Sequence, residues 1–135
     1  EKAGAALKEA GAKRVLPLKV SGPFHSSLME PAASKLKQEL LKVSISDLQI
    51  PYISNVTAQK VTDKQEIAGL LCEGIHSSVH WEQSVRYMIR QGVDTFVEIG
   101  PGRTLAGFMK KIDPAVTVKN VAVWEDVEKV VNELC

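Results

Sequence analysis

Residues 95–102 read Thr-Phe-Val-Glu-Ile-Gly-Pro-Gly and predict a buried strand followed by a tight turn. The first five residues are rich in β-branched and aromatic side chains, which favour a strand. Two glycines around Pro101 then interrupt the pattern, and residues 103–112 carry apolar side chains at helical spacing. We therefore expect a strand, a short loop and a helix in direct succession.

The same alternation of strands and helices extends over the rest of the chain. Thr62 with Gln65 resembles a capping box, Ser78 can cap the next helix, and Gly11 and Gly92 are suited to end helices. An alternating order predicts an α/β fold with a mostly parallel sheet covered on both faces. The expected strands are 14–20, 50–56, 95–99 and 118–123, and the expected helices are 2–10, 27–43, 62–75, 79–91, 103–112 and 125–134.

Composition excludes several classes of protein. The chain has 135 residues, of which 44% are hydrophobic and 24% charged, as in one soluble globular domain. Its net charge is +1 and its lysines alternate with acids, so nucleic acid is not expected as the main partner. No apolar run reaches the roughly 18 residues of a membrane span, and no signal segment opens the chain. We expect a cytoplasmic protein that does not bind membranes.

Two further features concern the thiols and the start of the chain. Cys72 and Cys135 lack the close spacing of a zinc site or a redox pair, so we expect free, structural thiols. Glu1 already lies in a helix-like segment, and the first methionine is Met29. We interpret the sequence as a piece of a longer protein.

A histidine occupies the loop Ser21–Ser26, between a predicted strand and a predicted helix. Gly22 permits a turn, and Pro23 fixes its own φ and disfavours helix at Gly22. Such loops often present catalytic groups, and His25 could carry protons near neutral pH. The alternative is a surface histidine without a chemical role.

Other candidate groups follow the predicted strands. The carboxyl ends of parallel strands face one crevice, so His25, Asn55 and the loop 100–102 could converge there. That loop could hold an anion at the following helix, but it matches neither dinucleotide nor P-loop spacing, and a plain tight turn is the simpler interpretation. His76 and His80 are four residues apart without a third ligand, so we expect a turn and no metal.

A histidine base needs a nucleophile to activate. The sequence contains no G-x-S-x-G turn and no cysteine near a suitable base. The chain thus holds half of a nucleophile–base pair.

Several co-linear motifs resemble the C-terminal part of malonyl-CoA:acyl carrier protein transacylases. The similarity runs from the first predicted helix to about Ile112, in order and with the family's spacing. The motifs are Val20-Ser21-Gly22-Pro23-Phe24-His25-Ser26, Leu28-Met29-Glu30-Pro31-Ala32, Pro51 with Ser54-Asn55-Val56-Thr57, Val79-His80-Trp81, and Val97-Glu98-Ile99-Gly100-Pro101-Gly102 with Leu105 and Gly107.

The resemblance implies an α/β-hydrolase-like acyltransferase subdomain with an inserted, ferredoxin-like small subdomain. Residues 1–19 would be the end of that small subdomain, and residues 20–135 the C-terminal part of the large one. The family's serine nucleophile, its malonyl-binding arginine and its oxyanion-hole glutamine would all belong to a missing N-terminal half.

By the same resemblance, His25 is the general base, held by the main-chain carbonyl of Gly74, where the family usually has Gln. It would activate the serine of the missing half, which accepts malonyl from coenzyme A and passes it to the phosphopantetheine thiol of acyl carrier protein. Phe24 and Asn55 would bind substrate, with Phe24 disfavouring methylmalonyl. Coenzyme A enters only as the thioester substrate, and no cofactor is expected.

Two alternatives stay open. The chain could be a fragment of the acyltransferase domain of a polyketide or fatty acid synthase. It could also be a non-catalytic module that docks acyl carrier protein through Arg103, Lys110 and Lys111, although these residues also suit a solvated helix face.

Overall fold

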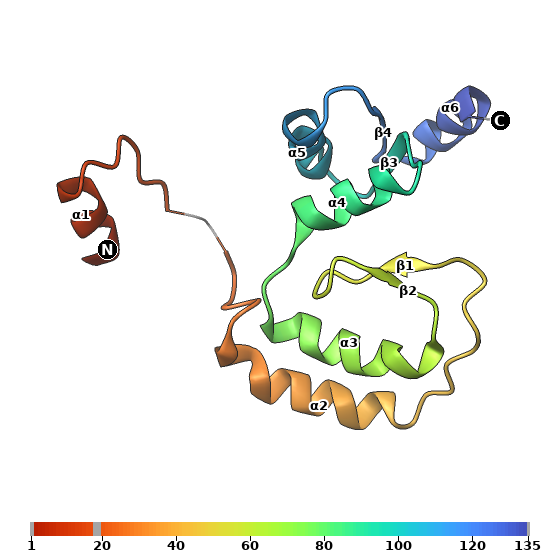
Figure 1. The fold of residues 1–135 in the computed structure, drawn as a ribbon, viewed down its shortest axis with the longest axis horizontal. Helices are drawn as coiled ribbons and strands as arrows, with labels where there is room; N and C mark the ends of the chain where they lie inside the picture. Colours follow the sequence, from red (N-terminus) through yellow and green to blue (C-terminus); the bar gives the residue numbers. More distant parts are fainter. Residues whose placement is uncertain (1, 18–19, 135) are drawn as a thin grey trace.

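The computed structural model describes residues 2–17 and 20–134. Figure 1 shows two groups of elements: α2 and α3 lie side by side below the hairpin of β1 and β2, and α4 leads to the group of β3, β4, α5 and α6. In chain order the elements are α1 (Lys2–Glu9), the 3-10 helix η1 (Ser27–Met29), α2 (Glu30–Leu40), β1 (Tyr52–Ile53), β2 (Lys60–Val61), α3 (Lys64–His76), α4 (Trp81–Arg90), β3 (Thr95–Ile99), α5 (Thr104–Ile112), β4 (Thr117–Val121) and α6 (Trp124–Leu134).

The predicted α/β content is confirmed, but the sheet differs from the prediction. β3 and β4 pair in parallel, from Thr95 opposite Thr117 to Ile99 opposite Val121, with α5 as the crossover helix. β1 and β2 form a separate antiparallel hairpin. Among the described residues there is thus one parallel pair beside one hairpin, and the expectation of a mostly parallel sheet covered on both faces is wrong for this part of the chain.

Two predicted strands are absent or shortened. No strand forms at residues 14–17 or at Val20, while residues 18 and 19 lie outside the described part. Pro17 lacks an N–H donor, the side chain of Leu16 is exposed, and no strand in the described part of the chain pairs with this segment. The strand expected at 50–56 is only β1, because Ser54 begins a turn in which its carbonyl accepts from Ala58 N at 2.8 Å.

Two of the predicted helix N-caps are wrong. The N-cap of α3 is Asp63, whose side chain accepts from Gln65 N at 2.8 Å, and not Thr62. His80, and not Ser78, precedes α4, and its side chain makes no capping hydrogen bond. Gly11 and Gly92 follow their helices with φ of 90° and 91°, as expected for glycines that end helices.

The core of the described residues is small. Val85 of α4 and Met109 of α5 are almost fully buried, and Ile67 of α3 and Val61 of β2 are buried as well. One prediction of burial is wrong: strand β3, expected to be buried, leaves Ile99 79% exposed. One face of β3 is therefore apolar and open. None of the helices in the described ranges combines the length and the apolar character needed to cross a bilayer.

Glu98 organises the loop between β3 and α5. Its carboxylate accepts hydrogen bonds from Leu105 N at 3.1 Å and Ala106 N at 2.8 Å, in the first turn of α5, and from Asn120 Nδ2 at 3.1 Å. Gly100 and Gly102 have φ of 139° and 93°, which explains the glycines of the loop. Because Glu98 already occupies donors at the helix N-terminus, the loop is a tight turn held by the chain's own carboxylate.

Replacing Glu98 should change how stability depends on pH. The hydrogen bonds from Ala106 N, Asn120 and Leu105 N lower the pKa of Glu98 below its ordinary 4.5, with the bond from Ala106 the largest cause and partial burial opposing it. The ionised carboxylate therefore stabilises the fold above pH 4.5, and this contribution is lost as the pH falls through the lowered pKa. We expect Glu98→Gln to lower the melting temperature at pH 7 and to flatten its fall under acid.

Thermal unfolding followed by circular dichroism between neutral and acid pH measures this effect. Glu128→Gln is the matched control, because Glu128 is exposed and makes no hydrogen bond or ion pair within the described residues. Equal acid profiles for the two variants would contradict the role of Glu98.

Candidate active site

His25 adopts a left-handed backbone conformation, with φ of 58°. This conformation is uncommon outside glycine, costs about 1 kcal/mol or more, and is held here by hydrogen bonds to the end of α3. His25 N donates to Ile75 O at 3.0 Å, and Ser26 Oγ donates to Pro23 O at 2.7 Å. Gly22, which the sequence suggested as the residue that turns, does not have a left-handed φ. The strained residue of the loop is the histidine itself.

The imidazole of His25 is held by the end of α3. Its Nδ1 lies 2.9 Å from Gly74 O and 3.1 Å from Ser77 O. Because both neighbours are carbonyl oxygens, which only accept, Nδ1 carries the hydrogen, and the neutral ring then has Nε2 as its acceptor. Together with Ile75 O, carbonyls from the last turn of α3 and the residue after it fix both the backbone and the ring of His25.

The resemblance implied that the carbonyl of Gly74 holds His25. It did not indicate the carbonyls of Ile75 and Ser77, which also accept from His25. Both act through main-chain oxygens, which every residue type carries, so no side-chain pattern could have revealed them. The same is true of Asn55 O, which accepts from His80 N at 2.8 Å and ties the loop after β1 to the start of α4.

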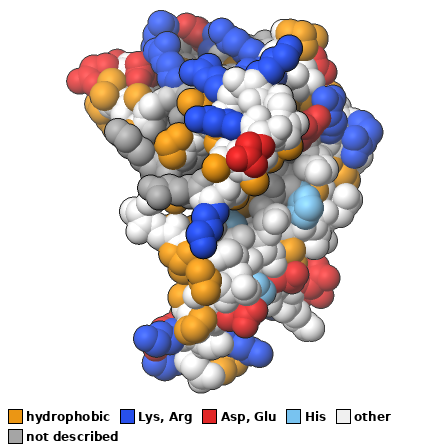
Figure 2. Space-filling view, turned by 90° about the vertical axis from the view of Figure 1, so that its left-hand side faces the viewer, with side chains coloured by type: hydrophobic (Ala, Val, Ile, Leu, Met, Phe, Trp, Pro, Cys, Tyr) orange, Lys and Arg blue, Asp and Glu red, His pale blue; other side chains and the backbone are white. Residues whose placement is uncertain are grey.

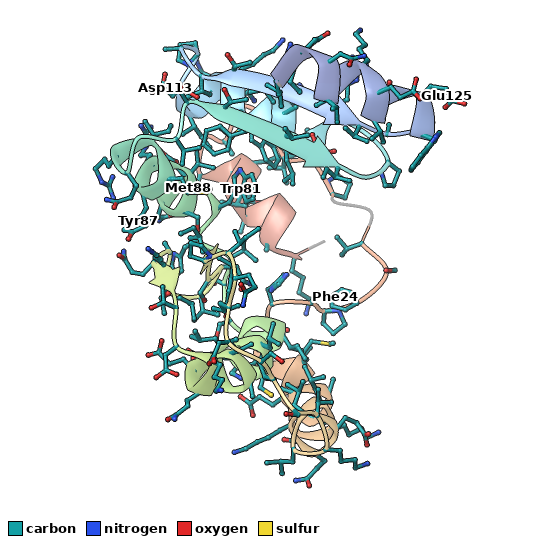
Figure 3. All side chains as sticks on the ribbon, turned by 90° about the vertical axis from the view of Figure 1, so that its right-hand side faces the viewer. Phe24, Trp81, Tyr87, Met88, Asp113 and Glu125 are labelled. Carbon is teal, nitrogen blue, oxygen red and sulfur yellow. The ribbon has the colours of Figure 1, made fainter. Side chains whose placement is uncertain are left out.

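The side chain of His25 lines a hollow of about 380 Å³. Phe24, His25, Asn55 and Gly74 all contribute to its wall, so the structure brings together the four residues singled out in the sequence. Figure 3 shows Phe24 on the loop, well away from Trp81, Tyr87 and Met88 of α4. The remaining wall is apolar and comes from Met29, Ala32, Leu71 and Ile75.

The Asn55 carboxamide is the other polar side-chain group in this wall. It lies against Gly74: a Cβ built on Gly74 would be 3.1 Å from Asn55 Oδ1 and 3.3 Å from Nδ2. Within residues 2–17 and 20–134 the carboxamide makes no hydrogen bond. It is therefore available to a bound molecule.

The Gly100–Gly102 loop lies elsewhere, which corrects the predicted convergence. Gly100 and Pro101 line a second hollow of about 310 Å³ with Trp81, Phe96 and Met109, and neither His25 nor Asn55 takes part in it. Because β3 and β1 belong to different sheets, their ends do not meet at one edge.

The other candidate groups do not form a site together. His76 ends α3 and His80 precedes α4, so a turn separates them. No group of three metal-ligating side chains is found in the described ranges. Cys72 is a free thiol, and Cys135 lies outside the described residues. Figure 2 shows histidine side chains reaching the surface on the face nearest α1.

The basic residues of the docking alternative lie at opposite ends of one helix. Arg103 precedes α5, and Lys110 and Lys111 are exposed in its last turn. Lysines at a helix C-terminus interact favourably with the helix dipole, so these two have a structural explanation.

Known proteins are similar to this chain in sequence and in fold. No family model matches the chain. The malonyl CoA-acyl carrier protein transacylase of Bacillus subtilis is 46% identical over 134 residues, and that of Escherichia coli K12 is 44% identical over 117 residues. These alignments cover 99% and 87% of this chain. The chain is a homologue of part of these transacylases.

Solved transacylase structures agree. The MCAT of Streptococcus pneumoniae superposes with a TM-score of 0.86 at 42% identity, covering 96% of this chain and 42% of that one. A malonyl-transacylase in complex with its type II PKS acyl-carrier protein superposes with a TM-score of 0.88 at 36% identity. The superposition covers 98% of this chain and 43% of the chain of that structure. The chain spans about two fifths of the length of the curated transacylases that it matches, 42% for B. subtilis and 38% for E. coli.

Proposed function

We propose that the complete protein containing this chain is a malonyl-CoA:acyl carrier protein transacylase of fatty acid biosynthesis. It moves malonyl from coenzyme A to the phosphopantetheine thiol of acyl carrier protein. The observation that carries the proposal is the imidazole of His25, held through Nδ1 by helix-end carbonyls in a chain homologous to such transacylases.

His25 acts as the general base in this proposal. With Nδ1 donating to Gly74 O, Nε2 takes the proton of a serine from the missing N-terminal half. The serine oxygen attacks the malonyl thioester, the carbon–sulfur bond breaks, and the imidazolium returns the proton to the leaving thiol of coenzyme A. The carrier's thiol then reverses these steps and takes malonyl from the serine.

Phe24 and Asn55 bind the acyl group. Phe24 is 60% exposed at the mouth of the hollow, where its ring would crowd a methyl branch and so favour malonyl over methylmalonyl. The Asn55 carboxamide offers a donor and an acceptor in an otherwise apolar wall, which suits a thioester or carboxylate oxygen.

The remainder of the protein would cover the open face of β3. In this proposal residues 1–19 end a ferredoxin-like small subdomain, and residues 20–135 complete an α/β-hydrolase-like large one. The exposure of Ile99 and Val97 supports the proposal, because strands of such sheets normally carry apolar residues where both faces are covered.

The reaction as proposed takes malonyl-CoA and acyl carrier protein as partners, needs no further cofactor and proceeds in the cytoplasm. Transfer to a polyketide carrier is the second candidate, favoured by one observation: a structural neighbour is a malonyl-transacylase solved in complex with its type II PKS acyl-carrier protein. Transfer assays with both kinds of carrier separate the two.

A covalent intermediate is the expected signature. Incubating the complete enzyme with labelled malonyl-CoA in the absence of carrier should release one coenzyme A per enzyme and leave the label on the protein. Adding acyl carrier protein should discharge it, and the kinetics should be ping-pong. Mass spectrometry of the intact enzyme measures both steps, with acetyl-CoA as the control substrate. Direct transfer that never labels the enzyme would contradict the mechanism.

A further inference from the structure

A buried serine closes the turn between β1 and β2. Ser54 is 1% exposed. Its N donates to Gln59 O at 3.0 Å, and its carbonyl accepts from Ala58 N at 2.8 Å. Its Oγ accepts from Val56 N at 3.2 Å and from Thr57 N at 3.5 Å. A serine hydroxyl that accepts from main-chain N–H groups two and three residues ahead fixes the chain in a turn.

The same turn contains a strained residue. Ala58 is 5% exposed and has a φ of 55°. A left-handed φ is costly for a residue with a Cβ and persists only where the surroundings fix it. One of the bonds that fix it runs from Ala58 N to Ser54 O. The conformation of the turn therefore depends on Ser54 and not on the local preference of its other residues.

Asn55 follows Ser54 directly, and its main chain is held on both sides. The Ser54 hydroxyl binds the N–H of the next residue, Val56. Asn55 O accepts from His80 N at 2.8 Å, and Figure 1 shows the closed end of the hairpin beside the segment that joins α3 to α4. The Asn55 carboxamide lines the hollow with His25 and makes no hydrogen bond within residues 2–17 and 20–134. A free polar group thus stands on a fixed main chain.

We infer that Ser54 is a positioning residue, whose hydroxyl holds the turn so that the Asn55 carboxamide faces the hollow with its hydrogen-bonding groups free for the acyl group. The inference rests on the proposed function, since it concerns the binding of malonyl by Asn55. A group held in its binding geometry beforehand loses little conformational entropy when the substrate arrives. Removing the hydroxyl leaves two N–H groups of the turn without an acceptor, so the main chain around Asn55 shifts.

Ser84 provides a matched control. It is also buried, at 5% exposed, and its Oγ donates to His80 O at 2.8 Å within α4. His80 O keeps the main-chain bond from Ser84 N, at 2.9 Å, when this hydroxyl is removed. Ser54→Ala and Ser84→Ala therefore delete the same buried atom, and only the first deletes an acceptor of the turn beside Asn55.

The test compares malonyl transfer by the complete enzyme carrying Ser54→Ala, Ser84→Ala, Asn55→Ala and the double variant Ser54→Ala/Asn55→Ala. We expect Ser54→Ala to lower kcat/KM for malonyl-CoA about 5-fold, because small misplacements of substrate-binding groups are costly. The loss should divide between kcat and KM in the same proportion as in Asn55→Ala. Ser84→Ala should stay within about 2-fold of wild type. In the Asn55→Ala background, Ser54→Ala should add less than about a 2-fold loss, because the carboxamide that it positions is gone.

Thermal unfolding separates positioning from a general loss of stability. Ser54→Ala should lower the melting temperature equally with and without the Asn55 carboxamide, since the hydrogen bonds that it removes do not involve that group. Each variant is assayed below its melting temperature. If Ser54→Ala is too unstable, the set is repeated in an Ala58→Gly background, because glycine adopts the φ of 55° without strain.

Three results would overturn the inference: losses of kcat/KM that add fully in the double variant, equal kinetics for Ser54→Ala and Ser84→Ala, or wild-type kcat/KM in Asn55→Ala. A wild-type enzyme that transfers no malonyl would instead refute the proposed function.

Discussion

Replacing His25 with alanine should lower kcat for malonyl transfer by the complete enzyme about 10²-fold or more, the usual effect of removing a general base. The ring has one nitrogen bound to Gly74 O and Ser77 O, which leaves Nε2 as its proton acceptor. Without the imidazole, nothing else in the hollow takes up a proton, because the other lining side chains are apolar or an amide. Steady-state kinetics with malonyl-CoA and acyl carrier protein measure the loss.

The backbone of His25 complicates this experiment and suggests a second variant. Alanine tolerates the φ of 58° poorly, so a loss in His25→Ala could arise from a displaced loop. Asparagine adopts left-handed conformations readily and is not a base. His25→Asn should lose as much kcat while keeping the melting temperature closer to that of wild type.

His76→Ala is the control for these histidine variants. His76 ends α3 and lines a different hollow with Cys72, outside the proposed site. Its removal should leave kcat within about 2-fold of wild type, as expected for a residue outside the catalytic machinery. If His25→Asn folds and turns over at a near-normal rate, His25 is not the base.

The sequence predicted the unit from β3 to α5 well because its signals are local. Four strand-forming residues around Glu98, two glycines and an amphipathic helix require no knowledge of distant segments. The role of Glu98 was missed for the opposite reason. A charge within a strand suggests a solvated side chain, and only the fold brings Leu105, Ala106 and Asn120 to its carboxylate.

The site was predictable in its residues but not in its backbone. The loop of Gly22 and His25 stood out by composition, yet the left-handed φ belongs to the histidine, because its N–H and ring are both bound by α3. From the local sequence alone, a left-handed φ is expected at glycine. Here the hydrogen bonds to α3 place it at His25 instead. The strand expected at 14–20 does not form at residues 14–17 or at Val20, since pairing needs a partner that a sequence window does not include.

The chain by itself should transfer no malonyl, and adding the proposed N-terminal half should restore transfer. Its sequence lacks a G-x-S-x-G nucleophile, so the expected loss is complete rather than partial. β3 pairs with β4 alone among the described residues, and Ile99 and Val97 are exposed on it. Association with the proposed N-terminal half should bury these side chains, because the gain is about 25 cal/mol for each Å² of apolar surface removed from water.

Mixing the two purified polypeptides, and assaying transfer at rising concentrations of the N-terminal half, measures this complementation. Ile99→Glu should weaken it, because burying an unpaired carboxylate against an apolar face is unfavourable. Val43→Glu is the matched control, since Val43 is 57% exposed but lies after α2, away from β3. Hydrogen exchange of the β3 amides should slow on mixing, which reports association independently of chemistry. Transfer by the chain alone would contradict a nucleophile supplied by the other half, and equal complementation by both variants would contradict docking on the open face of β3.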